Sequence, residues 1–171
     1  MKSLYSKILS DLSKYEKKNS LYKFVYTYVF KASFKYVFWL RVTNYFYKNI
    51  VFRYTVFPFS WIFWRHYSYK FGISIPYKTQ IGYGFKINHF TGIIINSKTV
   101  IGSNVTICQG VTLGNNSVRG DKRSPIIENG VYIAPGAKVF GGITVGDNCV
   151  IGANAVVTRS IEKNIVFSNK S

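Results

Sequence analysis

The chain has 171 residues, of which 23 are Lys or Arg and 6 are Asp or Glu, so its formal net charge at neutral pH is +17. This length suits one core with an appended subdomain. The charge predicts an anionic partner, either a membrane surface or a phosphorylated substrate. No nucleic-acid-binding motif accompanies the charge, so we expect no nucleic-acid partner. Two cysteines and two histidines are too few for a disulfide framework or a zinc site built from several histidines, so we expect no metal.

Residues 1–70 carry most of the positive charge and most of the aromatic side chains. They hold 13 Lys or Arg, 2 acidic residues and 23 of the 31 aromatics. Apolar residues at helical spacing predict a helix over residues 3–19, a helix or pair of helices over 20–49 with Ser20 as N-cap, and a short helix over 60–70 after Pro58. We therefore expect an aromatic, basic α-helical segment over residues 1–70.

Two interpretations of this segment stay open. Its aromatics either pack against the rest of the molecule and against neighbouring subunits, with solvated lysines, or lie with the basic residues on an anionic membrane surface. We expect His66 to be a packing or interface residue rather than a catalyst. The chain shows no signal peptide and no apolar run that could span a bilayer, so we expect a cytoplasmic protein, which the second interpretation places at the inner membrane face.

From Ile75 onward the sequence repeats in units of six. An aliphatic residue opens each unit, as at Ile81, Ile101 and Ile133, and a small or apolar residue takes the fifth place of the later units. Two interruptions break the register: two additional residues between Ile87 and Ile95, and a segment without the pattern over residues 114–126. A period of six fits neither a helix nor an alternating strand and is typical of a parallel β-helix, with second-position Gly, Asn or Ala at the corners. We predict a mainly β domain over residues 71–171 with residues 114–126 as an excursion loop.

A resemblance to known enzymes emerges in this repeat. Residues 75–76, 81–84, 87–96 and 110–114 resemble the hexapeptide-repeat acyltransferases. Within them, the branch related to serine O-acetyltransferase, found as sugar O-acetyltransferases in capsule and O-antigen pathways, is the most similar. The likeness covers about residues 72–165. It implies a left-handed parallel β-helix, acetyl-CoA as acyl donor, and a homotrimer whose sites lie between two β-helices and are walled by the excursion loop.

His89 occupies the place where the resemblance puts the general base. Acetyl transfer to a hydroxyl needs a group that removes the alcohol proton as attack proceeds, and imidazole has a suitable ordinary pKa of about 6.5. His89 is the one histidine of the repeat region. A covalent route through Cys108 is the alternative mechanism.

The chain departs from serine acetyltransferase at three matching positions. Ser74 and Asn88 stand where that enzyme has aspartates, and Ser124 stands where it has the histidine of a substrate-binding pair whose arginine is kept as Arg123. In serine acetyltransferase, the groups missing here would bind the ammonium and carboxylate of the amino acid. We therefore expect a neutral acceptor, a sugar hydroxyl, contacted by Ser74, Asn88, Arg123 and Ser124.

The donor site follows from the same resemblance. It places coenzyme A beside the C-terminal coils, with contacts at Gly114, Asn115, Pro135 and Ala153, and with backbone amides near Gly114 and Asn115 as oxyanion donors. Composition adds Lys138 and Arg159 as partners of its phosphates.

These observations predict an acetyl-CoA-dependent O-acetyltransferase acting on a carbohydrate acceptor in surface polysaccharide synthesis. Two alternatives stay open: a serine O-acetyltransferase, and a β-helix scaffold at the membrane surface without catalytic activity.

Overall fold

Four helices precede the repeats in the computed structural model, which describes residues 4–16, 20–117, 120 and 122–169. They are α1 (Leu4–Leu12), α2 (Leu21–Phe30), α3 (Ala32–Lys48) and α4 (Val56–Phe71). The predicted Ser20 N-cap is confirmed, because its side chain accepts a hydrogen bond from the Lys23 amide. The segment over 20–49 forms a pair of helices, separated by the extended residue Lys31.

Two predicted helix boundaries are wrong. The helix predicted over residues 3–19 ends at Leu12 and gives way to turns over residues 13–15, while residues 17–19 lie outside the described part of the chain. The last helix begins at Val56, before Pro58. Proline is tolerated in the first turn of a helix, where its missing N–H has no intrahelical acceptor, so Pro58 lies inside the helix rather than before it.

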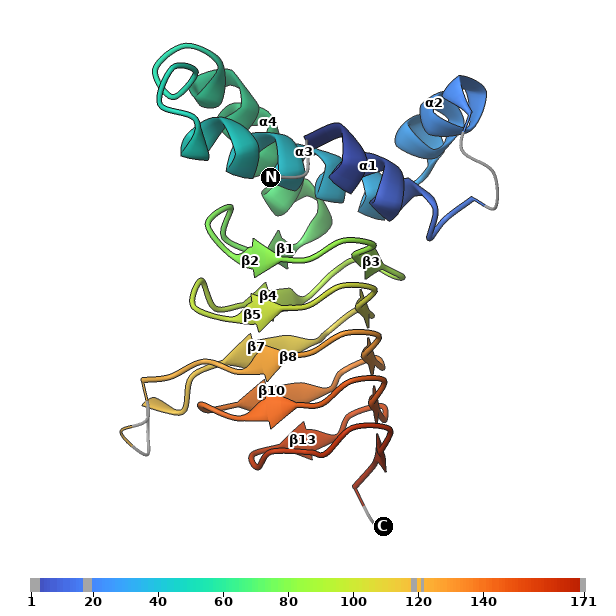
Figure 1. Ribbon diagram of the computed structural model, residues 1–171, viewed down its shortest axis with the longest axis vertical. Coiled ribbons are helices and arrows are strands. Elements are labelled where there is room, and N and C mark those ends of the chain that lie inside the picture. The colour runs from blue at the N-terminus through green and yellow to red at the C-terminus, as the bar shows by residue number, and fades with distance from the viewer. Residues whose placement is uncertain (1–3, 17–19, 118–119, 121, 170–171) are drawn as a thin grey trace.

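The rest of the chain winds into stacked coils of three short strands, which form three parallel sheets. The first sheet contains β1 (Ile73–Ser74), β4 (Ile93–Ile95), β7 (Thr112–Gly114), β10 (Lys138–Phe140) and β13 (Val156–Val157). The second contains β2 (Gln80–Ile81), β5 (Val100–Ile101), β8 (Ile126–Ile127) and β11 (Thr144–Val145). The third contains β3 (Lys86–Ile87), β6 (Thr106–Ile107), β9 (Tyr132–Ile133), β12 (Val150–Ile151) and β14 (Val166–Phe167). Figure 1 shows the helices at one end of this stack and the C-terminus at the other. The predicted parallel β-helix is confirmed.

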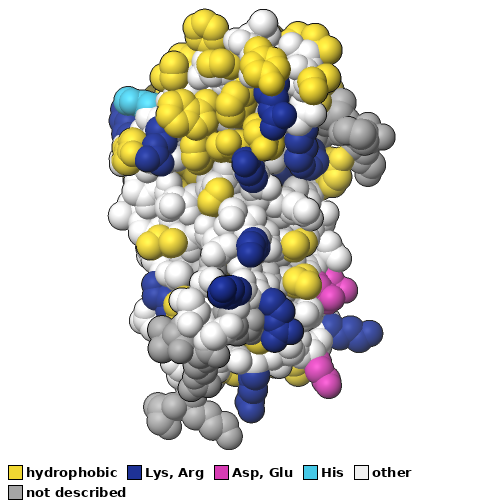
Figure 2. Space-filling model, turned by 90° about the vertical axis from the view of Figure 1, so that its left-hand side faces the viewer, with side chains coloured by type: hydrophobic (Ala, Val, Ile, Leu, Met, Phe, Trp, Pro, Cys, Tyr) yellow, Lys and Arg dark blue, Asp and Glu magenta, His cyan; other side chains and the backbone are white. Residues whose placement is uncertain are grey.

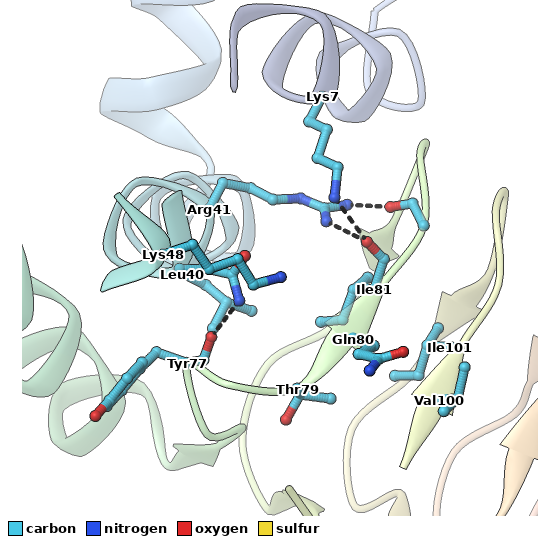
Figure 3. A pocket seen from close by; sticks show the side chains of 12 residues that line it. Lys7, Leu40, Arg41, Lys48, Tyr77, Thr79, Gln80, Ile81, Val100 and Ile101 are labelled. Carbon is cyan, nitrogen blue, oxygen red and sulfur yellow. Dashed lines mark hydrogen bonds between the residues drawn. The ribbon is translucent and has the colours of Figure 1, made fainter. Parts of the chain in front are cut away.

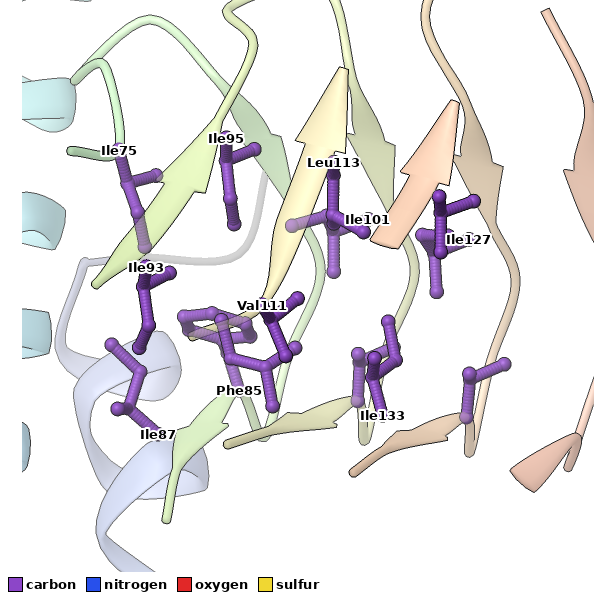
Figure 4. Packing of buried hydrophobic residues seen from close by; sticks show 14 of the residues in the cluster. Ile75, Phe85, Ile87, Ile93, Ile95, Ile101, Val111, Leu113, Ile127 and Ile133 are labelled. Atoms are coloured by element: carbon purple, nitrogen blue, oxygen red, sulfur yellow. The ribbon is translucent and has the colours of Figure 1, made fainter. Parts of the chain in front are cut away.

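Residues that open the hexads form the core. Ile87, Ile107 and Ile133 face one another in register along the third sheet and are fully buried. Figure 4 shows such side chains pointing into the interior from successive coils. Each coil therefore buries its aliphatic residues against those of the next coil, which is how a repeat with little core of its own becomes stable.

Glycine is required at the second position of the hexad because the backbone of the next coil lies too close for a Cβ atom. It is not required there by a positive φ. A Cβ on Gly82 would lie 2.5 Å from the backbone carbon of Gly102 in the next coil. Positive φ occurs instead at the fourth position, as at Gly136 with φ +74°. Close approach of the next coil and positive φ therefore favour glycine at two different positions of the hexad.

A buried ion pair joins the helices to the first coil. The Arg41 guanidinium on α3 donates to both carboxylate oxygens of Asp11 on α1, at 2.8 and 3.0 Å, and to the carbonyl oxygens of Ile81 and Gly82. Asp11 also accepts a hydrogen bond from the Phe85 amide at 2.8 Å. Tyr36 on α3 adds a hydrogen bond to the Ile75 carbonyl, and burial raises the pKa of Tyr36 to about 12. The helical segment is thus fixed to the β-helix by polar contacts that are buried from water.

Candidate active site

His89 lies on a two-residue insertion at a corner of the β-helix. The amide of Asn88 donates to Ile107, as the amide of Cys108 donates to Ile133 one coil further on. The amide of Gly110 donates to Thr91, as that of Gly136 donates to Gln109. Asn88 and Thr91 therefore match the consecutive residues Cys108 and Gln109, and His89 and Phe90 are the additional pair. The slip seen in the sequence is a local expansion of the corner between the third and first sheets.

The insertion leaves the His89 imidazole exposed, whereas the neighbouring Phe90 is held by packing. The Phe90 ring packs against Phe71 with centroids 5.2 Å apart, and Thr91 takes a φ of +97°. Within the described residues no hydrogen bond reaches the His89 side chain, so neither Ser74 nor Asn88 orients it there. Both of those side chains are exposed, Ser74 on β1 opposite Ile94 and Asn88 beside the histidine. An exposed, unanchored imidazole can act as a base once an acceptor or a second subunit packs against it.

Pro135 and Ala153 lie at the same corner as His89, on the coils further from the helices. The Gly136 amide donates to Gln109, and the Asn154 amide donates to Pro135, so Gln109, Pro135 and Ala153 occupy equivalent places in successive coils. Pro135 is half-buried and Ala153 is exposed. The structure therefore brings Pro135 and Ala153, two of the residues predicted to contact coenzyme A, to the same corner as His89, the predicted base.

The remaining predicted residues lie at a different corner, between the first and second sheets. Gly114 ends β7, and its carbonyl accepts a hydrogen bond from the Gly141 amide; Asn115 follows, half-buried. Arg123 packs across Gly142, where an added Cβ would lie 2.6 Å from the arginine Nε. Ser124 is buried, and its hydroxyl has no hydrogen-bond partner in the described structure. Within one chain, His89 and the loop residues thus belong to different corners.

The two predicted cations differ in their surroundings. The Lys138 ammonium donates to the Gly110 carbonyl at 2.6 Å and to the Thr112 hydroxyl at 3.0 Å, so it fastens neighbouring coils of the first sheet. Arg159 is exposed and lines an open pocket of about 610 Å³ near the C-terminus, together with Phe167 and Asn169. Arg159 is therefore better placed than Lys138 to meet a phosphate.

A nucleophilic role for Cys108 loses support. Its side chain is 1% exposed, and its sulfur lies 3.3 Å from the Tyr132 hydroxyl. The hydrogen bond between the Tyr132 hydroxyl and Cys108 raises the pKa of Tyr132, and burial adds to the effect. A buried thiol covered by a tyrosine is poorly placed to act as a nucleophile. The described residues contain no group of His, Cys, Asp and Glu that could hold a metal ion.

A cationic cleft, which the sequence did not reveal, lies between the helices and the first coil. Lys7 from α1, Arg41 and Lys48 from α3, and Gln80 from β2 line a space of about 330 Å³, shown in Figure 3. Burial, followed by the charges of Arg41 and Lys48, lowers the pKa of Lys7. None of the predicted site residues lines this cleft. Its residues come from distant parts of the chain, so no local motif marks it.

Comparisons with known proteins agree with this geometry. Residues 124–159 match the model described as bacterial transferase hexapeptide (six repeats), and residues 92–121 match the hexapeptide repeat of succinyl-transferase. A serine acetyltransferase of Helicobacter pylori (strain ATCC 700392 / 26695) is 49% identical over 90 residues, 53% of this chain and 53% of that protein. The chain spans about half the length of the curated relatives it matches.

Solved serine acetyltransferases share the whole fold. Serine acetyltransferase isoform 3 of Entamoeba histolytica, in complex with cysteine, superposes with a TM-score of 0.78 and 29% identity over 98% of this chain and 59% of its own. Serine acetyltransferase of Brucella abortus strain S19, in complex with coenzyme A, superposes with a TM-score of 0.76 and 26% sequence identity. The match covers 95% of this chain and 64% of that one. The predicted left-handed β-helix with its preceding helices is confirmed.

These relatives correct the predicted function. The sequence interpretation assigned a sugar acceptor in polysaccharide synthesis, because Ser74, Asn88 and Ser124 replace charged or basic groups. The matching sequences and structures are serine acetyltransferases, so this assignment is wrong. The matched repeats and the coil are those of hexapeptide-repeat transferases, and the relatives to which the chain is similar are serine acetyltransferases.

Proposed function

We propose that this protein transfers an acetyl group from acetyl-CoA to the hydroxyl of serine, with His89 as general base. The observation that carries this proposal is the likeness to serine acetyltransferases, which reaches 49% identity in sequence over 90 residues and includes nearly the whole of this chain in structure. The relatives' names give the reaction, and the exposed histidine on the expanded corner gives a group able to perform it.

His89 supplies the proton transfer that the reaction needs. Its imidazole accepts the proton of the serine hydroxyl while the oxygen attacks the thioester carbonyl carbon. The tetrahedral intermediate collapses, the carbon–sulfur bond breaks, and the imidazolium returns the proton to the departing sulfur. The products are O-acetylserine and free coenzyme A, and the base is regenerated. No covalent enzyme intermediate is required.

Arg123 is the candidate for the acceptor's carboxylate. A guanidinium can pair with a carboxylate through two parallel hydrogen bonds, which gives orientation as well as affinity. Arg123 is exposed on the loop, and the neighbouring Ser124 hydroxyl has no partner within the described residues. Binding of the serine carboxylate there would hold its hydroxyl at a fixed distance from the base.

The arrangement of corners favours a site shared between two copies of the chain. His89 lies between the third and first sheets, and Arg123 follows the first sheet on the way to the second. A trimer with parallel β-helix axes would bring the histidine corner of one copy beside the loop corner of the next. The donor would then lie along the corner column at Pro135 and Ala153, with Gly114 and Asn115 contributed from the adjacent copy and Arg159 near the phosphates.

Thiol release from acetyl-CoA in the presence of serine tests the role of His89. We expect His89→Ala to lower kcat by about 10² to 10⁴, which is the usual contribution of a general base. His66→Ala is the matched control, because His66 is exposed on α4 and contacts only the Tyr67 ring among the contacts described for it. Equal activity of His89→Ala and wild type would refute the assignment. Failure of the wild type to bind acetyl-CoA would favour the scaffold alternative.

A further inference from the structure

The helix α4 presents several large apolar side chains to solvent, while its buried face consists of Ser60, Trp64, Ser68 and Phe71. Ser60 and Ser68 are 2% and 8% exposed, whereas Phe59, Ile62 and Phe63 are 67%, 57% and 45% exposed. A helix that serves only to cover a core has the opposite pattern. The outward face of α4 is therefore built for contact with an apolar partner.

The connection before α4 extends this surface. We define the helical-end patch as the exposed apolar and aromatic side chains of this connection and of α4: Ile50, Val51, Phe52, Tyr54, Phe59, Trp61, Ile62, Phe63 and Tyr69. Figure 2 shows hydrophobic side chains gathered over this end of the molecule, with Lys and Arg side chains along the border toward the β-helix. An exposed patch of this kind marks an interaction site.

The charge around the patch is of one sign. No acidic residue occurs between Glu16 and Asp121 in the sequence. Arg53, Arg65 and Lys70 flank the patch residues, and no carboxylate among the described residues forms an ion pair with them. The guanidinium groups of Arg53 and Arg65 lie over tyrosine rings, at 4.4 Å from the Tyr47 centroid and 4.2 Å from the Tyr69 centroid. The partner must therefore be apolar at its centre and anionic at its border.

We propose that the helical-end patch binds the surface of an anionic lipid bilayer, with the coil axis pointing away from it. Aromatic and aliphatic side chains enter the boundary between headgroups and acyl chains, and the flanking Lys and Arg pair with lipid phosphates. Tyr and Trp suit this depth because their rings have an apolar body and a polar edge. No helix in the described parts of the chain is both long and apolar enough to cross a membrane, so the contact is peripheral.

A second copy of the chain fits the patch less well. Two-fold pairing through the same surface would place the basic border of one copy, with Arg53, Arg65 and Lys70, against that of the other, without an acidic residue in this region to offset the charge. Like charges in a contact of this kind oppose association. An anionic bilayer satisfies the apolar centre and the basic border together. This inference does not depend on the proposed acetyl transfer.

Vesicle flotation with the full chain tests the proposal. We expect the wild type to float with phosphatidylcholine vesicles that contain phosphatidylglycerol, at least about tenfold more than with phosphatidylcholine alone, and less so as salt is added. Phe59→Ser with Ile62→Ser should abolish flotation, and Arg53→Gln with Arg65→Gln should weaken it. Val166→Ser is the matched control, because Val166 is an exposed apolar residue at the far end of the β-helix.

Two further measurements keep the outcomes distinct. Brominated phosphatidylcholine in the anionic vesicles should quench tryptophan emission in the wild type, and Trp61→Phe should remove most of that quenching. Sedimentation without vesicles should give the wild type and the patch variants the same mass. The proposal is overturned if the wild type does not float, or if Val166→Ser loses as much flotation as the patch variant. It is also overturned if the patch variant sediments with a lower mass than the wild type while the wild type does not float with vesicles. That result would make the patch an interface between copies of the chain.

Discussion

Individual residues show how far a sequence can specify a site. His89 could be singled out from the sequence as a candidate base, because it is the one histidine in the repeats and lies where the hexad register slips by two residues. The predicted sugar acceptor was wrong. Ser74, Asn88 and Ser124 indicate which groups are missing, but a substrate is recognised by the groups that are present, and the proposed serine acceptor relies on Arg123, whose guanidinium can pair with a carboxylate. The covering of Cys108 by Tyr132 also required the structure, since the two are neighbours only across coils.

The buried pair of Asp11 and Arg41 gives a prediction at this scale. Asp11→Asn should lower the free energy of unfolding by about 3 to 5 kcal/mol, because it leaves the Arg41 charge buried without its carboxylate. Glu16→Gln is the control. It removes the charge of the pair with Lys23, in which the lysine side chain is 42% and the glutamate side chain 15% exposed, and keeps an oxygen that can accept from Thr27, so it should cost much less than Asp11→Asn. Urea unfolding curves compare the two variants. Equal costs would show that Asp11 does not hold the helices to the first coil.

The secondary-structure elements were predicted unevenly. The strands could be predicted from the hexad pattern, because each coil repeats the same pattern of burial. An error in register would expose a whole column of aliphatic residues. The helix ends were less accessible, since α1 ends at Leu12 in the middle of a continuing helical pattern and α4 starts two residues before Pro58. Which side of α4 is exposed could not be predicted, because half of its residues are aromatic and they occur all round the helix.

A core substitution tests the stacked coils. Ile107→Ala removes a fully buried side chain between Ile87 and Ile133 and should lower the free energy of unfolding by about 2 to 5 kcal/mol. Ile165→Ala alters an exposed side chain near the last strand, and we expect a change within about 0.5 kcal/mol. Thermal or urea unfolding measures both. A similar small effect for both variants would contradict tight packing between coils.

At the scale of the whole molecule, the β-helix separates functions along its length. The helical end carries the patch proposed to bind lipid, and the corner insertion below it carries His89. The base and the excursion loop lie at different corners of one chain, which is why the proposed site needs two copies. Assembly of this kind is invisible to hexad analysis, because outward positions of the coil tolerate many residues.

Mixing of subunits tests the shared site. His89→Ala and Arg123→Ala should each be inactive alone. Trimers refolded from an equal mixture should recover activity in about a quarter of their sites, where both contributing copies supply the intact residue. If both residues served a site within one chain, every chain in the mixture would be defective and no activity would return.

The most direct test of the account is identification of the acetylated product. Wild-type protein is incubated with acetyl-CoA and a mixture of serine and free sugars, and the products are resolved by mass spectrometry. The account predicts O-acetylserine as the main product and its loss in His89→Ala. An acetylated sugar without O-acetylserine would contradict it.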